Sequence, residues 1–364
     1  MELSAFINQL LANDQAFVCY RLPEAAEPVC LAGGDFEALV NLLDVQNEEG
    51  FVLVPFHASA EMPPLFYRGG QSYHGWQNEY PDVINKETPK GIKSKKNEFL
   101  SVGFQEYARQ ANHLVKKMRS GSLQKVVLSR IIAEPLSSSF EAGQFFENLC
   151  QKYPAAFIYL LNDGRGQCWA GASPEMLLAA EKGSASTMSL AGTLPAKKGG
   201  TSDFEWQDKE KEEQNLVTKF IREKLITSGI SDFIEAPLET RPAGPVVHLL
   251  KQFSFKMPGS LSALELAKNL HPTPAVCGLP ADLALKEILS TEDHQRGYYA
   301  GFLGPVSNSQ TAQLFVNLRC MQIVEKNAVI FVGGGLLTES EVEREWQETE
   351  TKAETLLSVI RKLN

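Results

Sequence analysis

QLFVNLRCMQIV (residues 313–324) and AVIFV (residues 328–332) are apolar stretches rich in β-branched and aromatic side chains, and only Glu325, Lys326 and Asn327 separate them. Stretches of this composition favour β-strands, and a connection of three residues predicts an antiparallel hairpin. Because one strand follows another with no helix between them, the hairpin argues against the βαβ alternation of a parallel sheet.

The rest of the chain extends this pattern. Further strands are predicted at residues 16–20, 51–56, 125–132, 155–161, 167–170 and 246–255. Apolar residues at helical spacing predict helices at residues 101–119, 141–152, 204–228, 261–269, 281–290 and 341–363. Ser202 with Glu205, and Ser340 with Glu343, have the spacing of capping boxes at two of these helix starts. Strands beside strands, with helices between and after them, predict an α+β fold with large antiparallel or mixed sheets.

The composition is that of a large globular protein. The 364 residues, 43% of them hydrophobic, suffice for two domains or one large one, and the lysine-rich residues 82–98 are the best candidate for a linker. A formal charge of −9 with interspersed signs argues against nucleic acid or an anionic membrane as the main partner. The N-terminus does not resemble a secretory signal, and no apolar run is long enough to span a membrane. Six scattered cysteines without a CxxC pair are typical of buried thiols in a reducing, cytoplasmic environment.

Two glutamate pairs, Glu210 with Glu213 and Glu345 with Glu348, suggest a metal site. Each pair has i,i+3 spacing, so both carboxylates lie on one face of a helix. Such pairs usually lie on solvated surface. Here, however, Glu213 and Glu345 fall within the apolar stripes of their helices, where an unpaired carboxylate would be unfavourable by several kcal/mol. Four converging carboxylates would suit a hard dication, above all Mg²⁺.

Three other residues are candidates for chemistry. Lys125 begins the strongly apolar strand KVVLSRII. Its side chain either reaches solvent or an ion-pair partner at the strand end, or acts as a base whose pKa is lowered by burial. Glu175 follows the turn formed by GASP, and is either an exposed turn residue or a general acid or base. Arg319, in an apolar strand, needs an anionic partner, and its geometry suits a carboxylate.

Two further segments are less specific. Gly333, Gly334 and Gly335 follow a strand and would let the backbone approach a ligand closely, although a bulge or tight turn explains them equally well. They match neither a dinucleotide-binding motif nor a P-loop. His271 lies in the rigid segment HPTPAVCGLP, where a single histidine is more often structural than catalytic.

These segments, in this order, resemble the chorismate-utilising enzymes, and among them most closely the isochorismate synthases. The matching stretches are LQKVVLSR, GASPEMLL, LAGTLPA, DKEKEEQNLV, HPTPAVCGLP, RGYYAGFLGPV, LRCMQI, FVGGGLL and EREWQETETKAETLL. They cover residues 101–364, the expected chorismate-binding catalytic region. Residues 1–100 would be a variable N-terminal part of the same fold. The resemblance implies one domain in which two sheets pack as a sandwich, with helices outside.

The resemblance also implies roles for particular residues. Glu213 and Glu348 match direct Mg²⁺ ligands, and Glu210 and Glu345 match carboxylates that reach the metal through water. Lys125 matches the base that activates water, and Glu175 the acid opposite it. The residues expected to bind substrate, including its carboxylates, are Arg319, Tyr299, Gly333, Lys352, Gly192, Thr193 and His271.

The implied reaction is an Mg²⁺-dependent isomerisation of chorismate to isochorismate, in which water adds at C2 and the C4 hydroxyl departs. The alternative is a salicylate synthase, which continues by eliminating pyruvate; a subunit that uses ammonia is a further rival. Gln214, where many relatives have histidine, and Gly334, where alanine is usual, depart from the family pattern. The resemblance implies a monomer, and isochorismate could feed either menaquinone or siderophore synthesis.

Overall fold

The structure is a computed structural model that describes residues 1–81, 101–197 and 204–364. The linker predicted at residues 82–98 and the predicted cap Ser202 lie outside these residues. In chain order the elements are α1 (Leu3–Ala12), β1 (Phe17–Arg21), β2 (Val29–Ala38), η1 (Leu42–Val45), β3 (Gly50–Val54), β4 (Leu65–His74), α2 (Phe104–Arg119), β5 (Lys125–Pro135), α3 (Ala142–Lys152), β6 (Phe157–Asn162), β7 (Cys168–Ser173), β8 (Met176–Glu181), β9 (Ser184–Pro195), α4 (Asp208–Thr227), β10 (Phe233–Glu235), β11 (Glu239–Ala243), β12 (Val246–Lys256), α5 (Ala263–Leu270), β13 (Gly278–Leu279), α6 (Ala281–Thr291), β14 (Phe302–Asn308), β15 (Thr311–Val316), β16 (Cys320–Val324), β17 (Asn327–Leu336) and α7 (Val342–Leu363).

The strands pair antiparallel throughout the described chain. Their order is β13-β5-β17-β16-β7-β6-β1-β2-β4-β3-β14-β15-β8-β9-β12, and β10 and β11 both pair with β12. The predicted hairpin is confirmed as β16 and β17, whose register brings Val324 opposite Asn327. The predicted α+β class is likewise confirmed, with antiparallel rather than mixed pairing.

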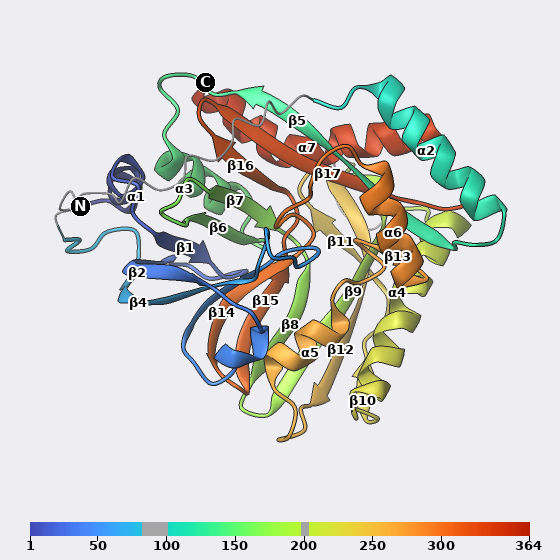
Figure 1. The fold of residues 1–364 in the computed structure, drawn as a ribbon, viewed down its shortest axis with the longest axis horizontal. Helices are drawn as coiled ribbons and strands as arrows, with labels where there is room; N and C mark the ends of the chain where they lie inside the picture. Colours follow the sequence, from blue (N-terminus) through green and yellow to red (C-terminus); the bar gives the residue numbers. More distant parts are fainter. Residues whose placement is uncertain (82–100, 198–203) are drawn as a thin grey trace.

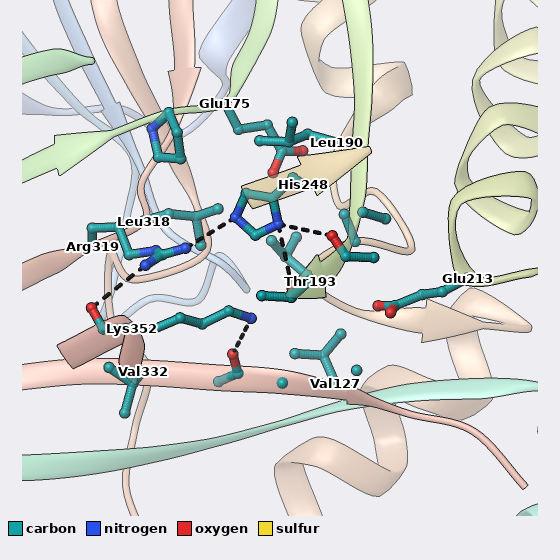
Figure 2. Close-up of a pocket in the computed structure, with 18 of the residues that line it drawn as sticks. Val127, Glu175, Leu190, Thr193, Glu213, His248, Leu318, Arg319, Val332 and Lys352 are labelled. Carbon is teal, nitrogen blue, oxygen red and sulfur yellow. Dashed lines mark hydrogen bonds between the residues drawn. The ribbon is translucent and has the colours of Figure 1, made fainter. Parts of the chain in front are cut away.

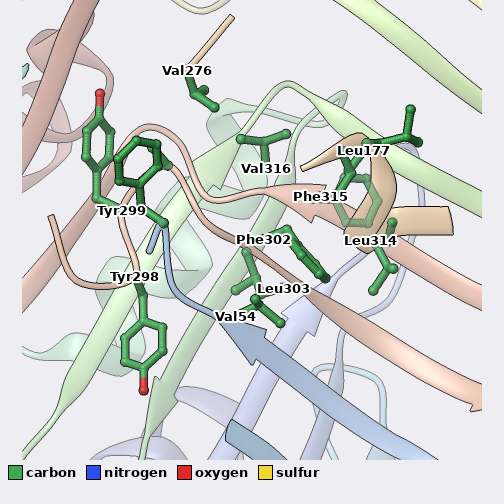
Figure 3. Packing of buried hydrophobic residues seen from close by; sticks show 14 of the residues in the cluster. Val54, Leu177, Val276, Tyr298, Tyr299, Phe302, Leu303, Leu314, Phe315 and Val316 are labelled. Carbon is green, nitrogen blue, oxygen red and sulfur yellow. The ribbon is translucent and has the colours of Figure 1, made fainter. Parts of the chain in front are cut away.

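The sheet folds over so that its two halves face each other, and the main core lies between them. Phe157 of β6 stacks on Phe315 of β15 with ring centroids 4.2 Å apart, although five strands separate β6 from β15 along the sheet. Figure 3 shows Phe315 with Phe302, Leu303 and Tyr299 in this buried cluster. This is the sandwich that the family resemblance implies.

Helices cover the outer faces of the folded sheet (Figure 1). The strand β6 is buried on both sides: Phe157, Tyr159 and Leu161 belong to the inner core, and Ile158 and Leu160 to a second cluster under α1, α3 and α7. The helix α4 packs on β9 and β12, and α5 packs on β8 and β15. None of the helices in the described ranges is long and apolar enough to cross a membrane.

Three details differ from the sequence-based expectations. The stretch 313–324 is not one strand, because β15 ends at Val316 and β16 begins at Cys320. The second predicted capping box is wrong: Ser340 Oγ accepts a hydrogen bond from the Leu337 amide, and α7 begins after Glu341 without a side-chain cap. Cys19 and Cys30 face each other across β1 and β2 and form a disulfide, so the expectation of buried thiols holds only for the other four cysteines, which are free and buried.

Candidate active site

The interruption between β15 and β16 forms one wall of a buried pocket. At its end the backbone of Arg319 takes a left-handed conformation with φ of 48°, which is uncommon outside glycine and typical of functional positions. This turn directs the Arg319 side chain into the pocket (Figure 2). The polar groups around the pocket belong to Glu175, Thr193, Glu213, His248, Tyr299, Arg319, Lys352 and the glycines 333–335.

The pocket is tight. Its free volume is about 60 Å³, enough for a few water molecules but below the roughly 300 Å³ at which small-molecule sites usually begin. Binding of a ring-sized ligand therefore requires some lining side chains to move.

Arg319 is buried, and its hydrogen-bond partners in the described chain are all neutral. Its guanidinium donates to Thr355 Oγ1 at 3.3 Å, to the carbonyl oxygen of Lys352 at 3.5 Å and to His248 Nε2 at 3.1 Å. Burial lowers the pKa of Arg319 to about 10. A buried cation without a carboxylate in hydrogen-bond contact, facing a cavity, is suited to an anionic ligand.

Glu175 lies across this pocket from Val332 of β17, in the turn between β7 and β8 (Figure 2). The side chain is buried, with the residue only 2% exposed, so it is not the exposed turn residue of the alternative interpretation. Burial raises its pKa to about 8, although the positive charges of Lys125 and Lys352 partly offset the effect. At neutral pH the carboxyl group is therefore mostly protonated and can donate a proton.

Lys125 lies behind the pocket wall rather than in it. It is fully buried, and its Nζ lies 2.9 Å from Glu213 Oε1, which does face the pocket. The contact has the distance of an ion pair but not the angles of a hydrogen bond, so this ammonium has no hydrogen-bond acceptor in the described chain. Burial opposes ionisation of Glu213, but Lys125, Lys352 and Lys209 together hold the pKa of its carboxyl below the usual range.

The other metal-ligand candidates also have partners. Glu348 accepts a hydrogen bond from Lys352 at 2.5 Å, and Lys352 also donates to the carbonyl oxygen of Gly333 at 3.0 Å. Glu345 is 1% exposed and forms an ion pair with Lys209; burial and the neighbouring Glu348 raise its pKa.

Glu210 has a different contact. Its carboxylate accepts a hydrogen bond from the Gln207 amide in a capping box, so the cap of α4 lies at Gln207 rather than at the predicted Ser202.

These carboxylates suit Mg²⁺ in type, but they do not converge in the present arrangement. Glu213 lies against Gly335, whereas Glu345 and Glu348 lie nearest Gly334, where an added Cβ would be 3.7 and 3.6 Å from their oxygens. No group of three or more potential ligands meets at one point in the described ranges. The residues fit a hard dication only if the carboxylates turn away from their lysines.

The remaining predicted residues divide between the pocket and its surroundings. Gly192, Thr193, Tyr299, Gly333 and Lys352 all line it.

His271 was predicted to lie with the substrate-binding residues, but it does not line this pocket. Its Nε2–H donates to the carbonyl oxygen of Phe56, its ring packs against Phe302, and burial lowers its pKa to about 4. The same segment contributes Ala275 and Val276 to the pocket instead.

Two ionisable residues in or beside the site, His248 and Lys209, had no sequence-based prediction. His248 lies in the predicted strand 246–255, and Lys209 is adjacent to Glu210. A histidine within the apolar run VVHLL was the one available signal for the first. The partner of Lys209, Glu345, is 136 residues away, so no local pattern could reveal the second.

Fold and pocket together define a class: an α+β protein with a folded antiparallel sheet and a buried pocket that Arg319 faces without a carboxylate hydrogen-bond partner in the described chain. Within that class the chain belongs to the chorismate binding enzyme family, whose model matches residues 71–361.

Individual relatives agree with this family. The chain is 29% identical to the isochorismate synthase EntC of Escherichia coli K12 over 241 residues, which is 65% of this chain and 62% of that protein. It is 32% identical to the salicylate biosynthesis isochorismate synthase of Pseudomonas aeruginosa over 253 residues, 67% of this chain and 52% of that one. The chain thus spans less than two thirds of the length of these relatives.

The fold also matches a solved structure over its whole length. A Bacillus anthracis protein assigned as a 2,3-dihydroxybenzoate-specific isochorismate synthase, DhbC, superposes with a TM-score of 0.82 and covers 100% of both chains at 20% identity. This likeness establishes the shared fold.

Proposed function

We propose that the chain catalyses the Mg²⁺-dependent isomerisation of chorismate to isochorismate. The observation that carries the proposal is that Glu175, a buried carboxyl group, lies in the same pocket as Arg319, a buried cation whose hydrogen-bond partners in the described chain are neutral. Relatives named isochorismate synthase support it.

Substrate binding follows from charge. Chorismate carries two carboxylates, and the guanidinium of Arg319 can hold one of them through paired N–H donors. Lys352 reaches the pocket from α7, and Tyr299 and the Gly333 backbone lie beside it. Fixing the ring between these groups orients C2 and C4 for reaction.

The proton transfers would be shared by two residues. Lys125, as the neutral amine, would accept a proton from the water that attacks C2, and Glu175 would donate one to the hydroxyl that leaves C4. One C–O bond forms and one breaks, and water is neither gained nor lost overall, so the reaction is reversible. Because Lys125 Nζ lies behind Glu213, its access to the pocket requires that carboxylate to move.

Glu213 and Glu348, with Glu210 and Glu345, would hold Mg²⁺. When bound, the ion would neutralise and anchor a substrate carboxylate. This chain's part is to supply hard oxygen ligands and to keep their charges balanced by Lys125, Lys352 and Lys209 until the ion arrives.

The test is to incubate purified protein with chorismate and Mg²⁺ and to identify the products by chromatography and NMR. Isochorismate without pyruvate is expected. Release of pyruvate without a partner protein would instead favour a salicylate synthase, and an amine product formed with ammonium would favour an ammonia-using relative. A protein that binds chorismate but leaves it unchanged would refute the proposed catalysis.

A further inference from the structure

His248 lies in the pocket wall, between Arg319 and the irregular part of β9 at Gly192, where the pairing of β9 with β12 shifts register. It is a β12 residue and is 6% exposed. Its Nε2 lies 3.1 Å from a guanidinium nitrogen of Arg319, and its Nδ1 lies 3.0 Å from the carbonyl oxygen of Gly192 and 3.3 Å from Thr193 Oγ1 (Figure 2).

These contacts determine where the imidazole proton lies. A guanidinium can only donate hydrogen bonds, so Nε2 must be an acceptor and carries no proton. A carbonyl oxygen can only accept, so Nδ1 carries the proton and donates it to Gly192. A charged imidazolium would have no acceptor at Nε2 and would face the positive charges of Arg319 and Lys352. Burial and these two cations accordingly lower the pKa of His248 well below its usual value.

Gly192 links this contact to the metal-ligand helix. Its φ of 70° is a left-handed conformation, and an added Cβ would lie only 2.9 Å from the carbonyl oxygen of Glu210, so this part of β9 packs closely against the first turn of α4. A continuous series of contacts thus runs from Arg319 through the His248 ring to Gly192 and Glu210.

We infer that His248 is a positioning residue that stays a neutral, Nδ1-protonated imidazole and fixes Arg319 in the orientation that receives a substrate carboxylate. With its Nε2 occupied by Arg319, the ring exchanges no proton with the substrate. The inference rests on the proposed function for the identity of the ligand as a dicarboxylate, but the state of the ring does not depend on turnover.

The tautomer can therefore be tested without substrate. Protein labelled with ¹⁵N at its six histidines would be examined by long-range ¹H–¹⁵N correlation at pH 7, with the His248 signals assigned by their loss in His248→Gln. The neutral Nδ1–H tautomer is expected. An Nε2–H tautomer, or a charged ring, would overturn the inference even if the enzyme proved to be an isochorismate synthase.

Two substitutions separate the two sides of the ring. Glutamine places an amide near the position of Nε2 and keeps an acceptor for Arg319, whereas asparagine places its amide near Nδ1 and keeps only the donor to Gly192. His248→Asn should weaken chorismate binding about 10- to 100-fold, as expected for losing a hydrogen bond to a charged group. His248→Gln should change it by less than about threefold because that bond is retained.

Chorismate affinity would be measured by calorimetry, KM and kcat by steady-state assay, and folding by thermal melting. A merely structural histidine would give both variants the same change in KM, with parallel losses in melting temperature. Equal KM values for the two variants, with wild-type turnover intact, would thus refute the positioning role and leave the proposed function standing. Wild-type protein that neither binds nor converts chorismate would refute the proposed function, and the tautomer measurement would still decide the state of His248.

Discussion

Glu175→Gln tests the proposed acid most directly. The substitution keeps the size and shape of the side chain but removes its acidic carboxyl proton. Loss of general acid catalysis should lower kcat by about 10²- to 10⁴-fold. The KM for chorismate should change little, because Arg319 and Lys352 provide the charges that bind the substrate. In the wild type, kcat should fall as pH rises through about 8, where Glu175 ionises.

The same substitution has a calculable effect on stability. The pKa of Glu175 rises from 4.5 in the unfolded chain to about 8 in the folded one. Between these values the native state binds more protons than the unfolded state, so the wild type loses stability progressively as pH rises from about 4.5 to 8. The difference of about 3.5 between the two pKa values corresponds to ~5 kcal/mol at 1.36 kcal/mol per pKa unit. Glutamine does not ionise, so the free energy of unfolding of the variant, relative to that of the wild type, should increase by up to that amount as pH rises from about 4.5 to 8.

The assay is denaturant unfolding of both proteins across pH 5 to 9, alongside pH profiles of kcat. Glu181→Gln at the exposed end of β8 is the matched control and should leave activity and its pH dependence unchanged. If the stability difference between wild type and Glu175→Gln did not change with pH, the carboxyl would not be buried in its neutral form. If kcat also persisted in the variant, another residue would have to supply the proton.

Three more substitutions probe the rest of the site. Arg319→Met should weaken chorismate binding about 10- to 100-fold with little change in Mg²⁺ affinity, because it removes a charged hydrogen-bond donor to the substrate; calorimetry measures both. Glu213→Gln should weaken Mg²⁺ binding by at least about tenfold in calorimetry, whereas Glu212→Gln, on the exposed side of the same helix, should not. Lys209→Met leaves the buried carboxylate of Glu345 without its cation and should lower metal-free stability by about 3 kcal/mol, with Mg²⁺ restoring part of it in thermal melts.

Each of these three predictions would be contradicted by a specific result. Unchanged chorismate affinity in Arg319→Met would show that the guanidinium of Arg319 does not bind a substrate carboxylate. Equal Mg²⁺ affinity in the Glu213 and Glu212 variants would show that Glu213 is not a metal ligand. A Lys209→Met protein as stable as the wild type would mean that Glu345 does not depend on that ion pair.

Much of the fold follows from local patterns. The three residues between the two stretches at 313–324 and 328–332 predicted a hairpin, and the helical spacing predicted α4 and α7 to within a few residues of their ends. These features depend on periodicity and turn length, which a sequence displays directly.

The interruption that creates the anion site could not be predicted in this way, because distant residues impose it. The backbone N–H of Asn317 donates a hydrogen bond to the carbonyl oxygen of Gly301 at 2.7 Å. Its side-chain Nδ2 donates to the carbonyl oxygen of Tyr298 at 2.9 Å, and its Oδ1 accepts a hydrogen bond from the Tyr159 hydroxyl at 2.7 Å. These bonds stop β15 at Val316 and turn the chain toward Arg319. In the sequence the same residues look like one continuous strand.

The charge balance of the site is also invisible in the sequence and bears on how the ligands enter. Glu213, Glu345 and Glu348 are matched by three lysines, Lys125, Lys209 and Lys352, which come from three different elements. Because each of these carboxylates already has its cation, a divalent ion entering alone would add two positive charges beside these lysines and Arg319, which is unfavourable at low dielectric. A dicarboxylate entering with the ion adds no net charge. If the proposed function holds, this arrangement would favour joint binding of metal and substrate, and it would explain how a site built from acidic residues accepts an acidic substrate.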